Sequence, residues 1–223
     1  MAEREKIART TQHQVYKNLA GKRVSGVTTI LGVIEKPALK FWANTIGLEG
    51  IMIRDYVDGL ADIGTLAHEM IHAHLNGLEM NYDDWTPNQI KAATNSYEKF
   101  LEWSSGREIE VIAAEVPLVS EKHQFGGMPD IIAMVDSVRT VVDIKTAKAI
   151  YDSHLWQVCA YTKLIEENGY GDIAQGLIVQ VGRSPDEGFT TRQITGDELE
   201  RGWKVFLLAQ QLKAATKPSD WKI

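Results

Sequence analysis

Two aspartates stand at positions of the sequence where they could hold a metal ion, and a lysine stands beside them. Asp130 ends the run 126–130 (Gly-Gly-Met-Pro-Asp), and Asp143 and Lys145 lie in the apolar run 141–145 (Val-Val-Asp-Ile-Lys). Side chains alternate along a strand, so Asp143 and Lys145 face the same side. Charges in an apolar strand are costly to bury unpaired. This pattern favours a functional site over the alternative, solvated residues at a sheet edge.

The chemistry that these residues suggest is hydrolysis of a phosphodiester with a divalent metal ion. That reaction needs a nucleophilic water and a neutralised phosphate, and a hard cation supplies both. Mg²⁺ and Mn²⁺ prefer carboxylate, carbonyl and water oxygens. We therefore expect Asp130, Asp143 and the backbone carbonyl of Ile144 to bind Mg²⁺ or Mn²⁺. Lys145 would orient the water and stabilise the transition state.

A helix expected over about residues 153–167 follows this site and could contact a substrate strand. Gln157 and Tyr161 are spaced to share one face of the helix. Lys148 and Trp156 also follow the site closely. Trp156 could stack on a base, as aromatic side chains do in proteins that bind single strands. Packing in the core is the alternative for this tryptophan.

The elements that would position these residues indicate a helical first part and an α/β core. We expect one domain over residues 1–223, with about 1–105 mainly helical and about 106–215 forming the core. The order α-β-β-β-α-β predicts a mixed sheet flanked by helices. The expected helices are 37–47, 62–75, 87–104, 153–167 and 197–215, and the expected strands are 111–119, 127–135, 138–146, 174–181 and the edge strand 189–194.

The ordered series of motifs resembles the PD-(D/E)XK nuclease superfamily, in its RecB-like branch. Residues 129–130 (Pro-Asp) and 143–145 (Asp-Ile-Lys) match the two-part motif of the family, here with Asp at the second acidic position. Residues 157–161 (Gln-x-x-x-Tyr) match the QxxxY motif of the branch, whose residues line the DNA path. Residues 64–68 (Gly-Thr-Leu-Ala-His) resemble its upstream histidine motif. The resemblance therefore implies that His68 binds or borders a metal ion.

The resemblance covers about residues 25–210, and it implies a restriction-endonuclease-like core. Residues 27–31 and 37–39 resemble the N-terminal segment of phage-encoded members and of the mitochondrial genome maintenance exonuclease. The implied activity is that of a DNA exonuclease on single-stranded DNA or duplex ends, in phage or bacterial replication, recombination or repair. An endonuclease of the same fold is the alternative. The chain has no P-loop of its own, so we expect either a stand-alone nuclease or a subunit whose partner supplies the motor. A replication or recombination protein is a further candidate partner.

Glu115 is a further candidate for the catalytic or metal site. It lies in the first strand expected in the core, where relatives of this type often carry an acid. A salt bridge at the end of the strand is an equally open interpretation.

A rival motif occupies residues 68–72, which spell HExxH. On a helix this spacing places His68 and His72 on one face, as in zinc proteases, with Glu69 as the base. Nothing downstream is a compelling third ligand, and the motif would leave Asp130, Asp143 and Lys145 unexplained. A catalytically silent DNA-binding protein is the other alternative, but such a protein would usually have lost an acid or the lysine.

Composition limits the remaining classes. The net charge of −6 excludes a globally basic surface, although a local basic rim could still bind phosphates. Cys159 is the single cysteine, so we expect neither a disulfide framework nor an iron–sulfur cluster. No apolar run is long enough to span a bilayer, and residues 1–6 lack the apolar core of a signal peptide. We therefore expect a cytoplasmic protein of a bacterium or a phage-infected cell, with no membrane partner.

Overall fold

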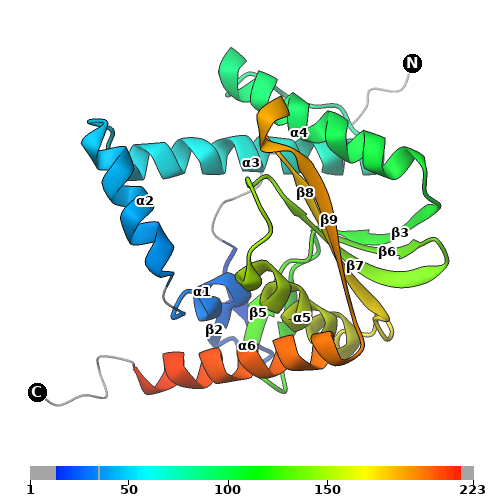
Figure 1. The fold of residues 1–223 in the computed structure, drawn as a ribbon. Helices are drawn as coiled ribbons and strands as arrows, with labels where there is room; N and C mark the ends of the chain where they lie inside the picture. The colour runs from blue at the N-terminus through cyan, green and yellow to red at the C-terminus, as the bar shows by residue number, and fades with distance from the viewer. Residues whose placement is uncertain (1–13, 35, 217–223) are drawn as a thin grey trace, which may run out of the picture.

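The computed structural model describes residues 14–34 and 36–216 (Figure 1). The segment 1–6, considered above for a signal peptide, lies outside these residues. Within the part of the chain that the structure describes, none of the helices has the length and apolar character needed to cross a bilayer. The fold is α/β, with helices packed on both faces of a mixed sheet.

A five-stranded sheet with the order β3-β6-β7-β8-β9 lies at the centre. β7 and β8 are parallel, and the other neighbours are antiparallel. Asp136 and Ser137 join β6 to β7 and have φ values of 49° and 65°, as a two-residue type I′ turn requires. The strands are β3 (Ile109–Ala114), β6 (Ile131–Val135), β7 (Val138–Lys145), β8 (Gln175–Val181) and the edge strand β9 (Phe189–Thr195).

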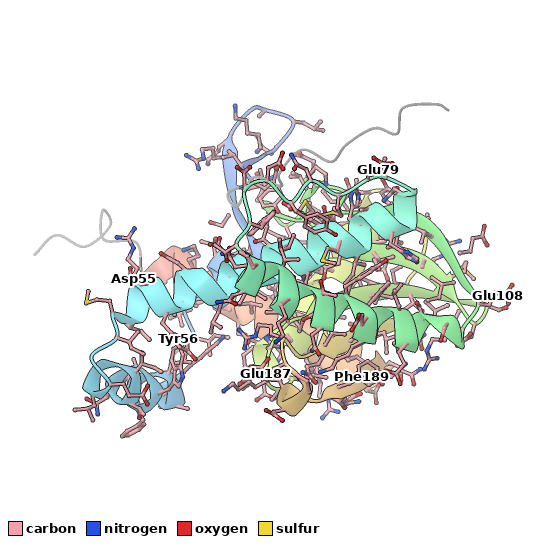
Figure 2. All side chains as sticks on the ribbon, turned by 90° about the horizontal axis from the view of Figure 1, so that it is seen from above. Asp55, Tyr56, Glu79, Glu108, Glu187 and Phe189 are labelled. Atoms are coloured by element: carbon pink, nitrogen blue, oxygen red, sulfur yellow. The ribbon has the colours of Figure 1, made fainter. Side chains whose placement is uncertain are left out.

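Two pairs of helices cover the two faces of this sheet (Figure 1). α3 (Ile53–Asn76) and α4 (Pro87–Ser105) lie side by side over one face (Figure 2). α5 (Asp152–Glu167) and α6 (Asp197–Ala215) pack together on the other. Asp55 and Tyr56 lie near the end of α3 that extends past the sheet towards α2 (Pro37–Leu48).

The side chains of β7 alternate between these two layers. Val142 and Ile144 pack into the core that includes Phe100 of α4. Val141 packs into the core that includes Val158 of α5. Asp143 and Lys145 are in phase with Val141, so both face the same side, as the sequence predicts, and that side is the α5 layer.

A second, smaller sheet has the order β1-β2-β5-β4. β1 (Tyr16–Lys17) and β2 (Arg23–Gly26) come from the first part of the chain, which is therefore not purely helical. β2 pairs in parallel with β5 (Phe125–Gly127), which in turn pairs with β4 (Leu118–Ser120). α1 (Val27–Leu31) follows β2 directly. This sheet ties the first part of the chain to the core.

Two of the expected strands are each divided in the structure. The strand expected over 111–119 becomes β3 and β4, because Glu115 adopts a left-handed φ of 49° and Pro117 lacks an N–H. The strand expected over 127–135 becomes the end of β5 and all of β6, with Pro129 in the gap. Both predictions were wrong in the same way, since an apolar run was extended across a proline.

The helices follow the prediction closely, except at the start of α3 and for the short α1, which was not expected. α3 begins at Ile53 rather than Asp62, and ends before Gly77, whose φ is 64°. α4 begins with Thr86 as N-cap and Gln89 closing a capping box. Apart from β4 and β5, which come between β3 and β6, the core elements α4, β3, β6, β7, α5 and β8 follow the predicted α-β-β-β-α-β order. A short 3₁₀ turn (Pro185–Glu187) lies between β8 and β9.

Candidate active site

The acidic residues Asp130 and Asp143 meet at neighbouring strand ends. Asp130 immediately precedes β6, and Asp143 lies near the end of β7, the strand paired with β6. The backbone amide of Ile144 donates a 2.7 Å hydrogen bond to Oδ2 of Asp130. The backbone amide of Glu115, at the end of β3, donates to the Asp130 carbonyl over 3.0 Å. The ends of three strands thus meet at Asp130, whose carboxylate is held by β7 and whose backbone is held by the residue after β3.

Pro129 leaves the Ile144 carbonyl without its usual strand partner. Val135 lies opposite Val138, and this register, extended along β6 and β7, places Pro129 opposite Ile144. In a two-residue hairpin the pair next to the turn, here Val135–Val138, is a hydrogen-bonded pair. Every second pair from there is also a hydrogen-bonded pair, and position 129 opposite Ile144 is one of them. Proline has no N–H to donate. The carbonyl of Ile144, on the same edge as its amide, is therefore available for a metal ion.

Lys145 and Asp143 form a buried ion pair. Nζ of Lys145 donates a 2.9 Å hydrogen bond to Oδ1 of Asp143 and lies 2.8 Å from Oδ2. The contact with Oδ2 lacks hydrogen-bond geometry, so this buried oxygen has no hydrogen-bond partner among the described residues. Burial raises the pKa of Asp143 to about 6, Lys145 opposes the rise and Asp130 adds to it. Burial alone would lower the pKa of Lys145, but Asp143 and Asp130 raise it, so its ammonium stays charged.

His68 approaches this pair of strands from α3. Gly64, one turn earlier, lies against the residue that follows β7: a Cβ at position 64 would be 2.9 Å from Oγ1 of Thr146. The missing side chain lets α3 come close, and Nδ1 of His68 then lies 3.6 Å from Oδ1 of Asp130. This explains the spacing of glycine and histidine in residues 64–68.

Glu115 and Glu69 add two more carboxyl groups to the same region. Burial raises the pKa of Glu115 to about 7; His68 opposes this rise, while Asp130 and Glu69 add to it. Glu115 is half-buried and has the left-handed φ described above, and such backbone strain is concentrated at functional sites. Glu69 is only 3% exposed. In the sequence analysis Glu69 appears only as part of the HExxH motif. Its burial beside acids on other elements could not be predicted, because no local sequence pattern indicates it.

Gln157 and Tyr161 lie on α5 and are joined to each other. Nε2 of Gln157 donates a 2.8 Å hydrogen bond to the Tyr161 hydroxyl. The pKa of Tyr161 is raised well above its usual value, first by burial and then by the charges of Asp143 and Asp130.

Two glycines make room for tyrosine rings beside β5. A Cβ at Gly127 would lie 2.6 Å from Cε1 of Tyr161, and a Cβ at Gly126 would lie 2.2 Å from Cγ of Tyr16. Because side chains alternate along a strand, the two rings lie on opposite faces of β5. Of the two glycines before the motif 129–130, Gly127 thus makes room for Tyr161 and Gly126 for Tyr16.

The interactions that the structure shows for Trp156 and Lys148 are with groups outside the ion pair. Trp156 is half-buried against the core under α6, where its Cδ1 would be 3.8 Å from a Cβ at Gly202. This is the core-packing alternative that the sequence left open for Trp156. Lys148 is exposed after β7, and its charge helps Arg183 to lower the pKa of Glu187 against the effect of burial.

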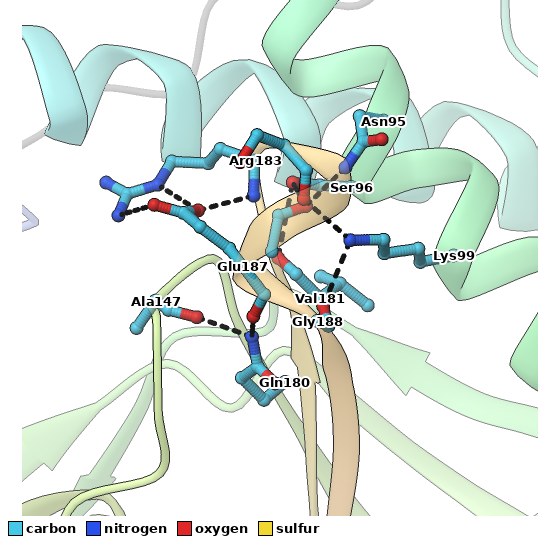
Figure 3. A network of polar contacts seen from close by, with 11 residues as sticks. Asn95, Ser96, Lys99, Ala147, Gln180, Val181, Arg183, Glu187 and Gly188 are labelled. Atoms are coloured by element: carbon cyan, nitrogen blue, oxygen red, sulfur yellow. Dashed lines mark hydrogen bonds and ion pairs between the residues drawn. The ribbon is translucent and has the colours of Figure 1, made fainter.

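A polar network fixes the segment that follows Lys145 (Figure 3). Gln180, the strand partner of Lys145, donates to the carbonyl of Ala147 over 2.6 Å and to that of Glu187 over 3.2 Å. Lys99 of α4 donates to the carbonyls of Ser184 and Gly188. The β8–β9 connection is thereby held between α4 and the end of β7.

The donor set suits a hard cation that is bound partly by water and substrate. Asp143 offers an oxygen without a hydrogen-bond donor, and the pKa values of Asp143 and Glu115 are raised in a region where added positive charge would offset burial. Among residues 14–34 and 36–216, no three or more His, Cys, Asp or Glu side chains are already placed to hold a metal. Mg²⁺ is commonly bound by one or two carboxylates, waters and phosphate oxygens. A zinc protease needs three protein ligands, so the HExxH interpretation is not favoured.

Comparisons with known proteins found similarity among solved structures only. No family model and no curated protein matches the chain. A candidate exonuclease from Eubacterium rectale is 14% identical, with 74% of this chain and 69% of that chain covered and a TM-score of 0.48. The alkaline exonuclease LHK-Exo from Laribacter hongkongensis is 13% identical, with coverages of 70% and 87% and a TM-score of 0.33. Since these values are low, the functional argument rests on the geometry of this chain.

Proposed function

We propose that this protein is a metal-dependent nuclease of the PD-(D/E)XK type that degrades DNA from an end, with single-stranded DNA as its substrate. One observation carries the proposal: Asp130, Asp143 and Lys145 meet at the ends of β6 and β7, with His68 on one side and the Gln157–Tyr161 pair on the other. The assignment as an exonuclease rather than an endonuclease comes from the motif resemblance alone.

The residues of the site divide the chemistry among them. Bound Mg²⁺ or Mn²⁺ would lower the pKa of a water and neutralise the phosphate. Asp130, Asp143 and the Ile144 carbonyl would hold the ion, with His68 as a further ligand or neighbour. Lys145, whose ammonium stays charged beside Asp143, would orient the water and stabilise the developing charge. Gln157 and Tyr161 would position the strand beside the ion.

The test uses linear single-stranded DNA labelled at each end in turn, with Mg²⁺ or Mn²⁺, and compares the wild type with Lys145→Ala and Lys91→Ala. Lys91 is an exposed lysine of α4 and serves as the matched control. We expect chelator-sensitive degradation that falls at least about a hundredfold in Lys145→Ala and is unchanged in Lys91→Ala. The label released first gives the polarity.

Two further outcomes separate the alternatives. Cleavage of a circular single strand as fast as a linear one would assign an endonuclease instead. DNA binding without cleavage in either metal would indicate a silent binding protein, and the nuclease proposal would be wrong. Metal binding is measured independently as a rise in melting temperature with Mn²⁺ that Asp143→Asn reduces.

A further inference from the structure

A pocket of about 330 Å³ lies between α1 and α5, beside the proposed catalytic lysine. Lys145 and Gln157 both line it, so the pocket continues directly from the candidate active site. The remaining polar groups of its wall are Thr28, Lys36, Ser153 and His154. The side chains of the wall therefore supply two ammonium groups, two hydroxyls, an imidazole and the carboxamide of Gln157.

A hydroxyl group positions the ammonium group of Lys36 at the edge of this pocket. Its Nζ donates a 3.0 Å hydrogen bond to Oγ of Ser153, in the first turn of α5. A lysine ammonium carries three protons, so further donors remain for a ligand. Among the described residues, the polar contact found for the Lys36 side chain is with this neutral hydroxyl, and no ion pair with a carboxylate is found for it.

His154 lines the same pocket as an uncharged donor. Its Nδ1 accepts a 3.3 Å hydrogen bond from the backbone amide of Tyr151, so the proton of the neutral ring is assigned to Nε2. Burial lowers the pKa of His154 to about 4, and the charges of Lys145 and Lys36 add to this effect. The ring is half-buried and forms part of the pocket wall.

We propose that this pocket binds a second phosphate of the nucleic-acid strand, next to the phosphate that is cleaved, and that Lys36 and His154 are its main contacts. Ammonium and N–H donors beside hydroxyls are the groups that bind phosphate oxygens. The inference rests on the proposed function, because Lys145 links the two phosphate positions. The phosphate is either a terminal monoester or an internal diester, and the same donors fit both.

The experiment measures binding of fluorescent single-stranded oligonucleotides by anisotropy, in Mg²⁺, on an Asp143→Asn background that prevents cleavage. Three oligonucleotides carry a phosphate at the 5′ end, at the 3′ end or at neither end. We expect Lys36→Gln to raise Kd about tenfold. It should also reduce the slope of log K against log salt by about 0.7, the value for one phosphate contact on a single strand. Lys91→Gln, on α4, removes an equal charge and should change neither quantity.

The pattern across the oligonucleotides identifies the source of the phosphate. A loss confined to one terminally phosphorylated oligonucleotide assigns a terminal monoester, and an equal loss for all three assigns an internal diester. His154→Gln, which keeps an N–H donor, should bind better than His154→Phe. If Lys36→Gln matches its parent in both Kd and salt slope while the wild type still cleaves DNA, the proposal that the pocket binds a phosphate is wrong, and the proposed nuclease activity is retained. If the parent binds no oligonucleotide and the wild type cleaves none, both proposals fall.

Discussion

The backbone amide of Ile144 donates a 2.7 Å hydrogen bond to the carboxylate of Asp130, and so joins the two acidic strands of the site. The amide belongs to the residue between Asp143 and Lys145. One carboxylate oxygen of Asp130 is thus used to fix β7, while the other faces His68. A single side chain therefore serves both the position of the lysine and the proposed metal site.

The double role of Asp130 predicts different effects for two substitutions. Asp130→Asn keeps an oxygen that can accept from Ile144 but loses the charge, so it should abolish cleavage with little loss of stability. Asp130→Ala also leaves the Ile144 amide without an acceptor, which costs about 1–3 kcal/mol. Urea unfolding in the presence of a chelator measures the difference. Equal unfolding free energies for the two variants would show that the hydrogen bond does not support the fold.

Glu115 should make the metal-free protein less stable as the pH rises. Burial raises its pKa from 4.5 to about 7. Between these values the folded state holds a proton that the unfolded state releases, so the free energy of unfolding falls with rising pH. Glu115→Gln removes this dependence and should gain stability relative to the wild type between pH 5 and pH 8.

Urea unfolding at the two pH values, with a chelator present, tests this expectation. Asp143 titrates with the same sign but is present in both proteins, so it cancels in the comparison. Glu110→Gln, at an exposed position of β3, is the matched control and should follow the wild type. The idea fails if Glu115→Gln also loses stability with the wild-type slope.

Much of the site could be predicted because it depends on local patterns. The period of two in the run 141–145 put Asp143 and Lys145 on one face, and the helical spacing put Gln157 and Tyr161 together. Both arrangements are found. A pattern within one strand or helix needs no information about its distant neighbours.

The features that the sequence did not reveal depend on distant parts of the chain. β2 pairs in parallel with β5, about a hundred residues further along the chain. Parallel strands are not joined by a tight turn, so no turn signal in the sequence predicts this pairing. Glu69 is buried by the packing of α3, and Lys36 and His154 line one pocket because α1 lies against α5. The division of the long strands at Glu115 and at Pro129 was visible in part, since both gaps contain a proline.

Gly127 should be required for the position of Tyr161. A Cβ there would meet Cε1 of Tyr161 at 2.6 Å and Cδ2 of Leu164 at 3.1 Å. Gly127→Ala should therefore cost about 1–3 kcal/mol and weaken DNA binding, because the ring must move. Gly106→Ala, where nothing lies within 4 Å of the added Cβ, is the control and should change neither. Thermal unfolding and anisotropy measure the two effects, and unchanged DNA binding in a folded Gly127→Ala variant would contradict the role assigned to Tyr161.

The contact between α5 and α6 predicts a steric conflict that a second substitution should relieve. A Cβ at Gly202 of α6 would lie 2.3 Å from Sγ of Cys159, on α5. Alanine favours a helix over glycine by about 1 kcal/mol, but the clash should outweigh this gain and leave Gly202→Ala less stable by about 1–3 kcal/mol. Gly59→Ala in α3, with nothing within 4 Å of its Cβ, should instead be stabilising.

Removing the sulfur in the double variant Gly202→Ala/Cys159→Ala should recover part of the loss. The Cβ of Cys159 would still lie 2.9 Å away, so recovery should be incomplete. Residues in contact typically show coupling energies of about 0.5–3 kcal/mol, and urea unfolding of the two single variants and the double variant measures this coupling. Strictly additive losses would mean that Gly202 does not contact Cys159. They would also contradict the tight packing of α6 on α5, the helix that carries Gln157 and Tyr161.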